Sequence, residues 1–219
     1  MKLTYDYLPG TAIYLHQRKD MFRMNTDTAL LGHFMKIKEN ESVLDIGTNN
    51  GALLLYASQY TKGQLIGVDI QKEACELAKQ NLEENHIKHF QIICDDIAHV
   101  NLEPVDVIVC NPPYFKTSNE SNLNENEAKK IARHECYLTL ETLFSSVSSL
   151  LKEKGRFYLV HRADRIVDLC CELRAHGLEI KTIQMVRDCE KENVHGILIE
   201  AVKQAKAHCV VKQEKIITR

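Results

Sequence analysis

The sequence lacks the features that would place the chain in a membrane or outside the cell. It contains no run of about 18 apolar residues, which a transmembrane helix needs. Its first twenty residues hold no continuous apolar stretch of the kind found in a signal peptide. Its eight cysteines form no Cys-x-x-Cys pair, and the adjacent Cys170 and Cys171 do not have the spacing of a zinc site. These absences predict a cytoplasmic protein with reduced thiols and no bound metal.

An excess of charge of one sign is also missing. The formal net charge is −2, which excludes a globally basic nucleic-acid coat protein. Positive charge is nevertheless concentrated in residues 203–219, where five basic residues stand against a single acid, Glu214. Such a tail could contact an RNA phosphate backbone, although charge runs at chain termini are more often only solvated.

Short apolar runs that alternate with helical periodicity predict a parallel α/β sheet. Its five strands are expected at 42–47, 64–70, 90–96, 105–110 and 156–161. The helices are expected at 52–59, 72–85, 139–152 and 163–175. Two late runs, 178–186 and 196–203, have no helix between them and predict an antiparallel hairpin at the sheet edge. This order is that of the class I methyltransferase (Rossmann-like) sheet, mostly parallel with a C-terminal antiparallel hairpin.

The carboxyl ends of the first three strands carry acids and glycines in an ordered series. Ligands of open α/β sheets bind beyond these strand ends. The first strand runs into DIGTNNG (45–51), where Gly47 and Gly51 let the backbone approach a ligand closely. Asp69 ends the second strand and can accept both ribose hydroxyl hydrogens, whereas Asp96 ends the third and can hold an adenine edge. The series predicts the nucleoside cofactor S-adenosyl-L-methionine.

The glycine-rich turn departs from the usual methyltransferase pattern at one position. Asn49 stands where that pattern has glycine. Asparagine tolerates a positive φ better than most residues, so the turn is still expected to form. A nicotinamide cofactor would instead require GxGxxG and a pyrophosphate seat at a helix N-terminus, which GTNNG does not supply.

The tetrapeptide NPPY (111–114) directly follows the fourth strand and indicates the chemistry. The exocyclic amine of adenine is a poor nucleophile because its lone pair is delocalised into the ring. The amide oxygen of Asn111 and the carbonyl oxygen of Pro112 could accept hydrogen bonds from the two N–H groups of this amine. Pro113 would help to hold these acceptors rigidly. Tyr114 offers a face on which the target base could stack. The motif suits a planar amine or amide acceptor, so a glutamine side chain also remains possible.

With these motifs, the sequence resembles the bacterial tRNA(Val) adenine-N6 methyltransferase family, in the NPPY group of class I S-adenosylmethionine-dependent methyltransferases. The resemblance extends over most of the chain and rests on FRMNTDTALLG (22–32), LDIG, VDI, DDI, NPPY, Arg133-His134-Glu135 and the late run ILIEA. It implies that Thr26 and Asp27 lie beside the methionine end of the cofactor, and that the substrate is the adenosine beside the anticodon of a valine tRNA. The expected cofactor-binding residues are Thr26, Asp45, Gly47, Asn49, Gly51, Asp69, Ile70, Asp96, Ile97 and Asn111.

We therefore expect a single domain over residues 1–219 that methylates adenine N6 in tRNA, with residues 1–40 covering the cofactor end. The polar segment 116–130 could close over the target base, and Arg133 and His134 could contact a tRNA phosphate. The alternatives are a DNA adenine-N6 methyltransferase, a protein glutamine-N5 methyltransferase and a catalytically idle RNA-binding protein of the same fold. The first usually needs a target-recognition domain and the second an extra N-terminal helical domain, for which 219 residues leave little room.

Overall fold

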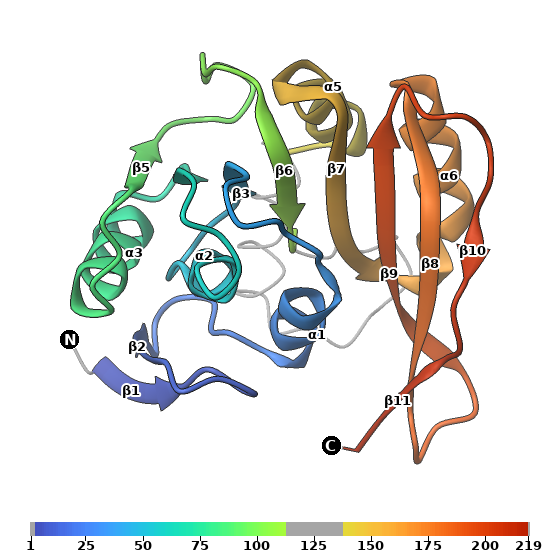
Figure 1. Cartoon of the computed structure of the whole chain (residues 1–219). Coiled ribbons are helices and arrows are strands. Elements are labelled where there is room, and N and C mark those ends of the chain that lie inside the picture. The colour runs from blue at the N-terminus through green and yellow to red at the C-terminus, as the bar shows by residue number, and fades with distance from the viewer. Residues whose placement is uncertain (1–2, 113–137, 219) are drawn as a thin grey trace.

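The computed structural model describes residues 3–112 and 138–218 and is organised around one large mixed sheet (Figure 1). The strand order is β10-β8-β9-β7-β6-β3-β4-β5, and β11 also pairs with β8, further along that strand than β10 does. The central strands are β3 (Val43–Ile46), β4 (Leu65–Asp69), β5 (Phe90–Cys94), β6 (Val105–Cys110) and β7 (Leu151–Arg162). The remaining strands are β8 (Leu178–Asp188), β9 (Val194–Lys203), β10 (Val210–Val211) and β11 (Lys215–Ile217).

The five central strands are parallel, as expected for strands joined by helices. β9 runs antiparallel to both β7 and β8, which confirms the late hairpin. β9 lies between β7 and β8, and the short β10 and β11 pair in parallel with the far side of β8. The fold is therefore the expected mostly parallel sheet with an antiparallel C-terminal part.

Helices cover both faces of the sheet because its central strands are apolar on both sides. They are α1 (Thr26–Phe34), α2 (Ala52–Ala57), α3 (Lys72–Glu84), α5 (Leu140–Leu150) and α6 (Ile166–Ala175), the last preceded by a 3-10 turn, η1 (Ala163–Arg165). Successive strand residues point to opposite faces. Thus Leu44 packs in the core with α5 and α6, whereas Val43 packs in the core with α1 and α2. Among the described residues, no helix is long and apolar enough to cross a membrane.

The structure moves one expected boundary by several residues. The fifth strand was expected at 156–161 but begins at Leu151, directly after α5. Leu151 already pairs with Val105, and the ladder resumes at Arg156 after an irregularity. Gly155 fits there because a Cβ at this position would lie 2.8 Å from the carbonyl oxygen of Lys152. The expected start was too late because three charged residues (152–154) and Gly155 interrupt the apolar run.

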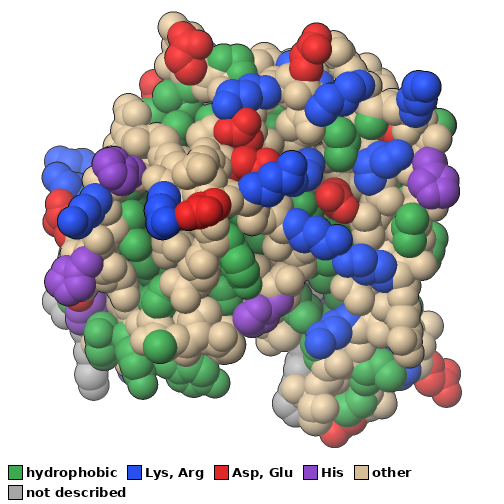
Figure 2. Space-filling model, viewed as in Figure 1, with side chains coloured by type: hydrophobic (Ala, Val, Ile, Leu, Met, Phe, Trp, Pro, Cys, Tyr) green, Lys and Arg blue, Asp and Glu red, His purple; other side chains and the backbone are tan. Residues whose placement is uncertain are grey.

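The N-terminal residues form a hairpin that periodicity did not predict. β1 (Leu3–Tyr7) pairs antiparallel with β2 (Tyr14–Arg18). Its inner face buries Leu15 and Gln17, and its outer face leaves Tyr5 and Tyr7 about 60% exposed. Figure 2 shows hydrophobic side chains at the lower left of this face of the molecule, where β1 and β2 lie in Figure 1.

Candidate cofactor and catalytic site

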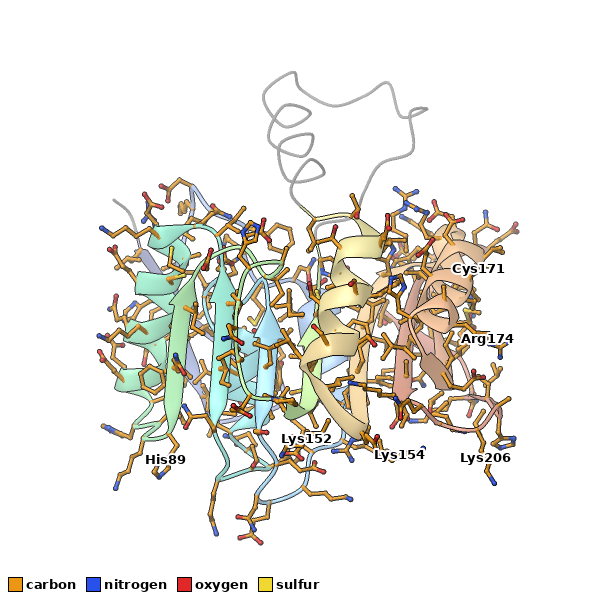
Figure 3. All side chains as sticks on the ribbon, turned by 90° about the horizontal axis from the view of Figure 1, so that it is seen from above. His89, Lys152, Lys154, Cys171, Arg174 and Lys206 are labelled. Atoms are coloured by element: carbon orange, nitrogen blue, oxygen red, sulfur yellow. The ribbon has the colours of Figure 1, made fainter. Side chains whose placement is uncertain are left out.

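The predicted residues at the carboxyl ends of β3, β4, β5 and β6, as far as the structure describes them, lie at one edge of the sheet. Figure 3 shows the arrowheads of the parallel strands at the edge opposite Lys152, Lys154 and Lys206. β3 lies between β4 and β6, so the residues that follow these three strands are neighbours. In the β3–β6 register Ile46 stands opposite Cys110, so Gly47 and Asn111 each follow a paired residue. The edge therefore brings together residues from the DIGTNNG turn, the end of β4 and the beginning of NPPY.

The turn after β3 has three residues in the left-handed region, at Gly47 (φ 73°), Asn49 (φ 49°) and Gly51 (φ 78°). The Asn49 angle agrees with the expectation that asparagine can replace glycine there. A Cβ added at Gly47 would have no atom within 4 Å, so the side of this glycine is open. A Cβ at Gly51 would be 3.4 Å from Ala78 of α3. Gly47 thus presents open backbone, whereas Gly51 allows the turn to lie close to a helix.

Asp69 is held rigidly at the end of β4. Its Oδ2 accepts a hydrogen bond from the Asn49 amide (2.9 Å), and its Oδ1 accepts one from the Gln71 amide (2.9 Å). The side chain is only 7% exposed, whereas the following Ile70 is 43% exposed. A carboxylate fixed by two backbone donors has lone pairs left for hydroxyl groups of a ligand. The exposed Ile70 side chain provides an apolar surface next to it.

The end of β5 supplies a second carboxylate. Asp96 accepts a hydrogen bond from the Ala98 amide through Oδ1 (2.9 Å), and its own amide donates to Asp95 (2.8 Å). The Asp95 amide in turn donates to the Asp69 carbonyl (3.1 Å), which ties this segment to the end of β4. Ile97 is buried in the core. The segment therefore holds Asp96 at the strand edge next to that of Asp69.

Asp45 is the most unusual charged group of the turn. It is 1% exposed, and its Oδ1 has no hydrogen-bond partner among the described residues. Burial, together with the nearby charge of Asp69, raises the pKa of Asp45 to about 7. A buried oxygen without a partner suits a ligand that supplies a donor or a positive charge. S-adenosylmethionine carries both an ammonium and a sulfonium group, so this acid fits the expected cofactor.

Asn49 connects the turn to the N-terminal segment. Its Nδ2 donates to the carbonyl oxygen of Phe22 (2.6 Å), while its Oδ1 is buried without a partner in the described part of the chain. A glycine at this position would lack the first contact. The departure from the usual pattern therefore keeps the turn geometry and adds a link to residues that precede α1.

Asn111 follows β6, and its side chain contacts α1. Its Nδ2 donates a 3.0 Å hydrogen bond to Oγ1 of Thr28, a residue that sequence reasoning did not select. The neighbouring Pro112 is buried. Pro113 and Tyr114 lie outside the described residues, as do the segment 116–130, Arg133 and His134. Of the predicted catalytic residues, the structure thus places Asn111 and Pro112.

The remaining predicted cofactor residue is at the start of α1. Thr26 is the first residue of the helix and is exposed, and Asp27 beside it is 7% exposed. Asn25 caps the helix by accepting a hydrogen bond from the Thr28 amide (3.0 Å). The side chain of Asn111 therefore contacts the helix that begins with the predicted cofactor residue.

Asn81 of α3 is a second residue that sequence reasoning missed. It is fully buried, and its Nδ2 donates to the carbonyl oxygens of His16 (3.0 Å) and Asn50 (2.9 Å). Its Oδ1 accepts a hydrogen bond from the His16 amide (2.7 Å). One side chain thus joins the β1–β2 hairpin to the DIGTNNG turn. The only available signal was an asparagine among the apolar positions of a predicted helix.

The basic C-terminal segment folds onto the sheet. Lys203 donates to the Leu151 carbonyl (2.8 Å), and Lys212 lies over the Phe34 ring at 4.9 Å from its centroid. Figure 2 shows that Lys and Arg side chains gather on the right half of this face, over β7 to β9 and the C-terminal segment. Part of this positive charge therefore makes contacts within the chain.

Comparisons with known proteins identify the family of the chain. The model of the methyltransferase domain family matches residues 37–214. A tRNA1(Val) (adenine(37)-N6)-methyltransferase from Flavobacteriaceae bacterium (strain 3519-10) is 31% identical over 149 residues, covering 67% of this chain and 62% of the relative. The protein of the same name from Phocaeicola vulgatus is 31% identical over 167 residues, covering 75% of this chain and 70% of the relative.

Solved structures share the fold at lower identity. A predicted O-methyltransferase from Agrobacterium tumefaciens gives a TM-score of 0.67 at 14% identity, over 87% of each chain. A Thermus thermophilus 16S rRNA N2 G1207 methyltransferase, solved with AdoMet and guanosine, gives a TM-score of 0.63 at 18% identity. That match covers 92% of this chain and 50% of the other.

Proposed function

Because the chain belongs to the methyltransferase domain family and, within it, to the tRNA1(Val) (adenine(37)-N6)-methyltransferases, we propose that it methylates adenine N6 in a valine tRNA. It is an S-adenosylmethionine-dependent methyltransferase. The proposed target is the adenosine beside the anticodon, and the names of its relatives give adenine 37. We further propose that residues 1–219 act as one domain, in the cytoplasm, with residues 1–40 covering the cofactor end.

The cofactor would be held by the carboxyl ends of β3, β4 and β5. When bound, S-adenosylmethionine supplies an electrophilic methyl group. The buried Asp45 would face its positive charge, Asp69 its ribose hydroxyls and Asp96 with the Ile97 amide its adenine edge. The backbone of the turn would provide contacts at Gly47, Asn49 and Gly51, while Ile70 would cover the adenine and Thr26 would lie at the methionine end.

The observation that carries the proposed chemistry is the position of Asn111. It follows β6 one strand away from the DIGTNNG turn, and its amide nitrogen is already engaged by Thr28. Its Oδ1 and the Pro112 carbonyl oxygen would each accept a hydrogen bond from one N–H of the adenine amine. The nitrogen lone pair would then be less delocalised into the ring and could bond to the methyl group as the methyl–sulfur bond breaks, and the amine would release one proton to solvent. Pro113 would stiffen the acceptors and Tyr114 would stack on the base.

The RNA would have to present its target base outside a duplex. A base in a single-stranded loop can be splayed out at lower cost than a base in a helix. An anticodon loop meets this requirement. Arg133, His134 and the basic residues after Lys203 are the proposed phosphate contacts, and binding should then weaken as salt is raised.

The test is methyl transfer from labelled S-adenosylmethionine to unmodified total tRNA, followed by nucleoside analysis. The wild type should yield N6-methyladenosine in a valine tRNA. Asn111→Ala should lower kcat by about 10²–10³-fold, the scale reported for loss of one preorganised polar contact. Asn101→Ala, an exposed asparagine in the loop before β6, is the matched control.

Each outcome points to a different conclusion. If Asn111→Ala keeps wild-type turnover, the proposed chemistry is wrong. If the wild type modifies no tRNA but modifies DNA or a glutamine side chain when either replaces tRNA in the assay, the proposed acceptor is wrong. If it binds tRNA without transferring a methyl group to any of the three, the chain is an idle RNA-binding protein.

A further inference from the structure

Three polar side chains form a hydrogen-bonded series that ends at Asn111. Oδ1 of Asn25 lies 3.2 Å from Oγ1 of Thr28, and Oγ1 of Thr28 lies 3.0 Å from Nδ2 of Asn111. Thr28 is 6% exposed, so water has little access to replace these bonds. The bond between Thr28 and Asn111 connects residues 83 positions apart and joins the first turn of α1 to the end of β6.

The direction of each hydrogen bond follows from its partners. The Thr28 backbone N–H can only donate, so the Asn25 atom that faces it must be the amide oxygen. That same oxygen faces the Thr28 hydroxyl and cannot donate, so the hydroxyl gives its hydrogen to Asn25. Only lone pairs of Thr28 Oγ1 then remain for Asn111, which must present its nitrogen. The network therefore fixes which end of the Asn111 amide points away from Thr28.

We propose that Thr28, held by Asn25, is a positioning residue that keeps Oδ1 of Asn111 directed at the substrate amine. The inference rests on the proposed function of Asn111 as an acceptor for that amine. A rotated amide would present N–H donors to the amine hydrogens, and no acceptor would be available. Donation from Nδ2 to Thr28 also polarises the amide, which makes Oδ1 a stronger acceptor. The N-terminal segment would thus contribute to turnover as well as to cofactor contact.

The test compares Thr28→Val, which removes the hydroxyl and keeps a β-branched side chain, with Thr28→Ser, which keeps it. We expect Thr28→Val to lower kcat by about three- to tenfold, the equivalent of one ordinary net hydrogen bond. The cofactor Kd, measured by calorimetry, and the KM for tRNA should remain at wild-type values. Thr28→Ser should restore most of kcat.

Thr182→Val is the matched control because it also removes a buried hydroxyl, which donates to Glu200 (2.6 Å) on β9 far along the sheet. It should leave kcat unchanged. Thermal melting checks that each variant folds, and Thr28→Ala replaces Thr28→Val if valine prevents folding. A comparable decrease in kcat in Thr182→Val would show general destabilisation and overturn the proposal.

Asn111→Ala separates this inference from the proposed function. If Asn111→Ala retains turnover, the proposed function of Asn111 is wrong, and the positioning role that rests on it is overturned as well. If Asn111→Ala abolishes turnover while Thr28→Val has wild-type kcat, only the positioning role is overturned. The positioning role is also overturned if Thr28→Val weakens cofactor binding in step with kcat, or if Thr28→Ser fails to restore turnover.

Discussion

Replacing Asp45 by Asn should stabilise the cofactor-free protein at high pH and not at low pH. Burial raises the pKa of Asp45 from 3.8 to about 7 in the folded chain. Below pH 4 the carboxyl group is protonated in both the folded and the unfolded state, so it does not change the free energy of unfolding. Between pH 4 and 7 the unfolded chain loses this proton while the folded chain retains it, so stability falls as pH rises. Above pH 7 the folded protein bears the full free-energy cost of burying the ionised carboxylate of Asp45.

The magnitude follows from the size of the pKa change. A change of about three units corresponds to about 4 kcal/mol of folding free energy, as an order of magnitude. For a protein of this size that is equivalent to a Tm difference on the order of 10 °C. Asparagine cannot ionise and nearly matches the shape of aspartate. The variant should therefore exceed the wild type in free energy of unfolding by only about 1 kcal/mol at pH 4.5 and by about 4 kcal/mol at pH 8.5.

Urea unfolding followed by circular dichroism from pH 4.5 to 8.5 provides the assay, with both proteins free of cofactor. Glu103→Gln is a control because Glu103 is an exposed acid in the loop before β6. A stability difference that is constant across this range, or a variant that is less stable at pH 8.5, would refute the account of Asp45. Saturating cofactor should also stabilise the wild type more than Asp45→Asn at pH 8, because only the wild type offers a buried negative charge to the cation.

Two further changes test other parts of the site. Gly47→Ala should lower cofactor affinity measured by calorimetry, because the new methyl group enters the open space beside the turn and strains a residue at φ 73° by about 1 kcal/mol; unchanged affinity would show that no ligand approaches this glycine. Asn81→Ala should lower the free energy of unfolding by about 2–4 kcal/mol in a urea titration, because it leaves backbone groups of His16 and Asn50 buried without their partner. A loss below 0.5 kcal/mol, roughly the scatter of surface substitutions, would mean that water replaces this side chain.

The sequence predicted those parts of the fold that depend on local pattern. β3, β4 and β6 were predictable because nearly every residue in them is apolar and buried. The turn at Asn49 followed from the conformational tolerance of asparagine. β1, β2, β10 and β11 were missed because none has as many Val, Leu and Ile residues as β3 or β4. Short strands of this kind are stabilised by the surfaces on which they pack.

The contacts of the site were less predictable than its residues. The ordered acids were visible because each lies at or just after the carboxyl end of a strand. The contact of Thr28 with Asn111 joins two segments that are remote in sequence, and neither segment carries a local signal of the other. Asn81 reads as a polar interruption on the buried face of α3 until its backbone partners are known. Tertiary hydrogen bonds of this kind require the fold itself.

The position of β9 between β7 and β8 has a consequence for synthesis on the ribosome. β7 remains an open sheet edge until residues 194–203 have left the exit tunnel, although all the strands proposed to hold the cofactor have been made by then. At about 5–20 residues per second, that interval lasts several seconds. A long apolar strand with unpaired backbone groups invites pairing with other chains. The newly made protein is therefore most vulnerable to aggregation after its catalytic half is complete and before its last long strand arrives.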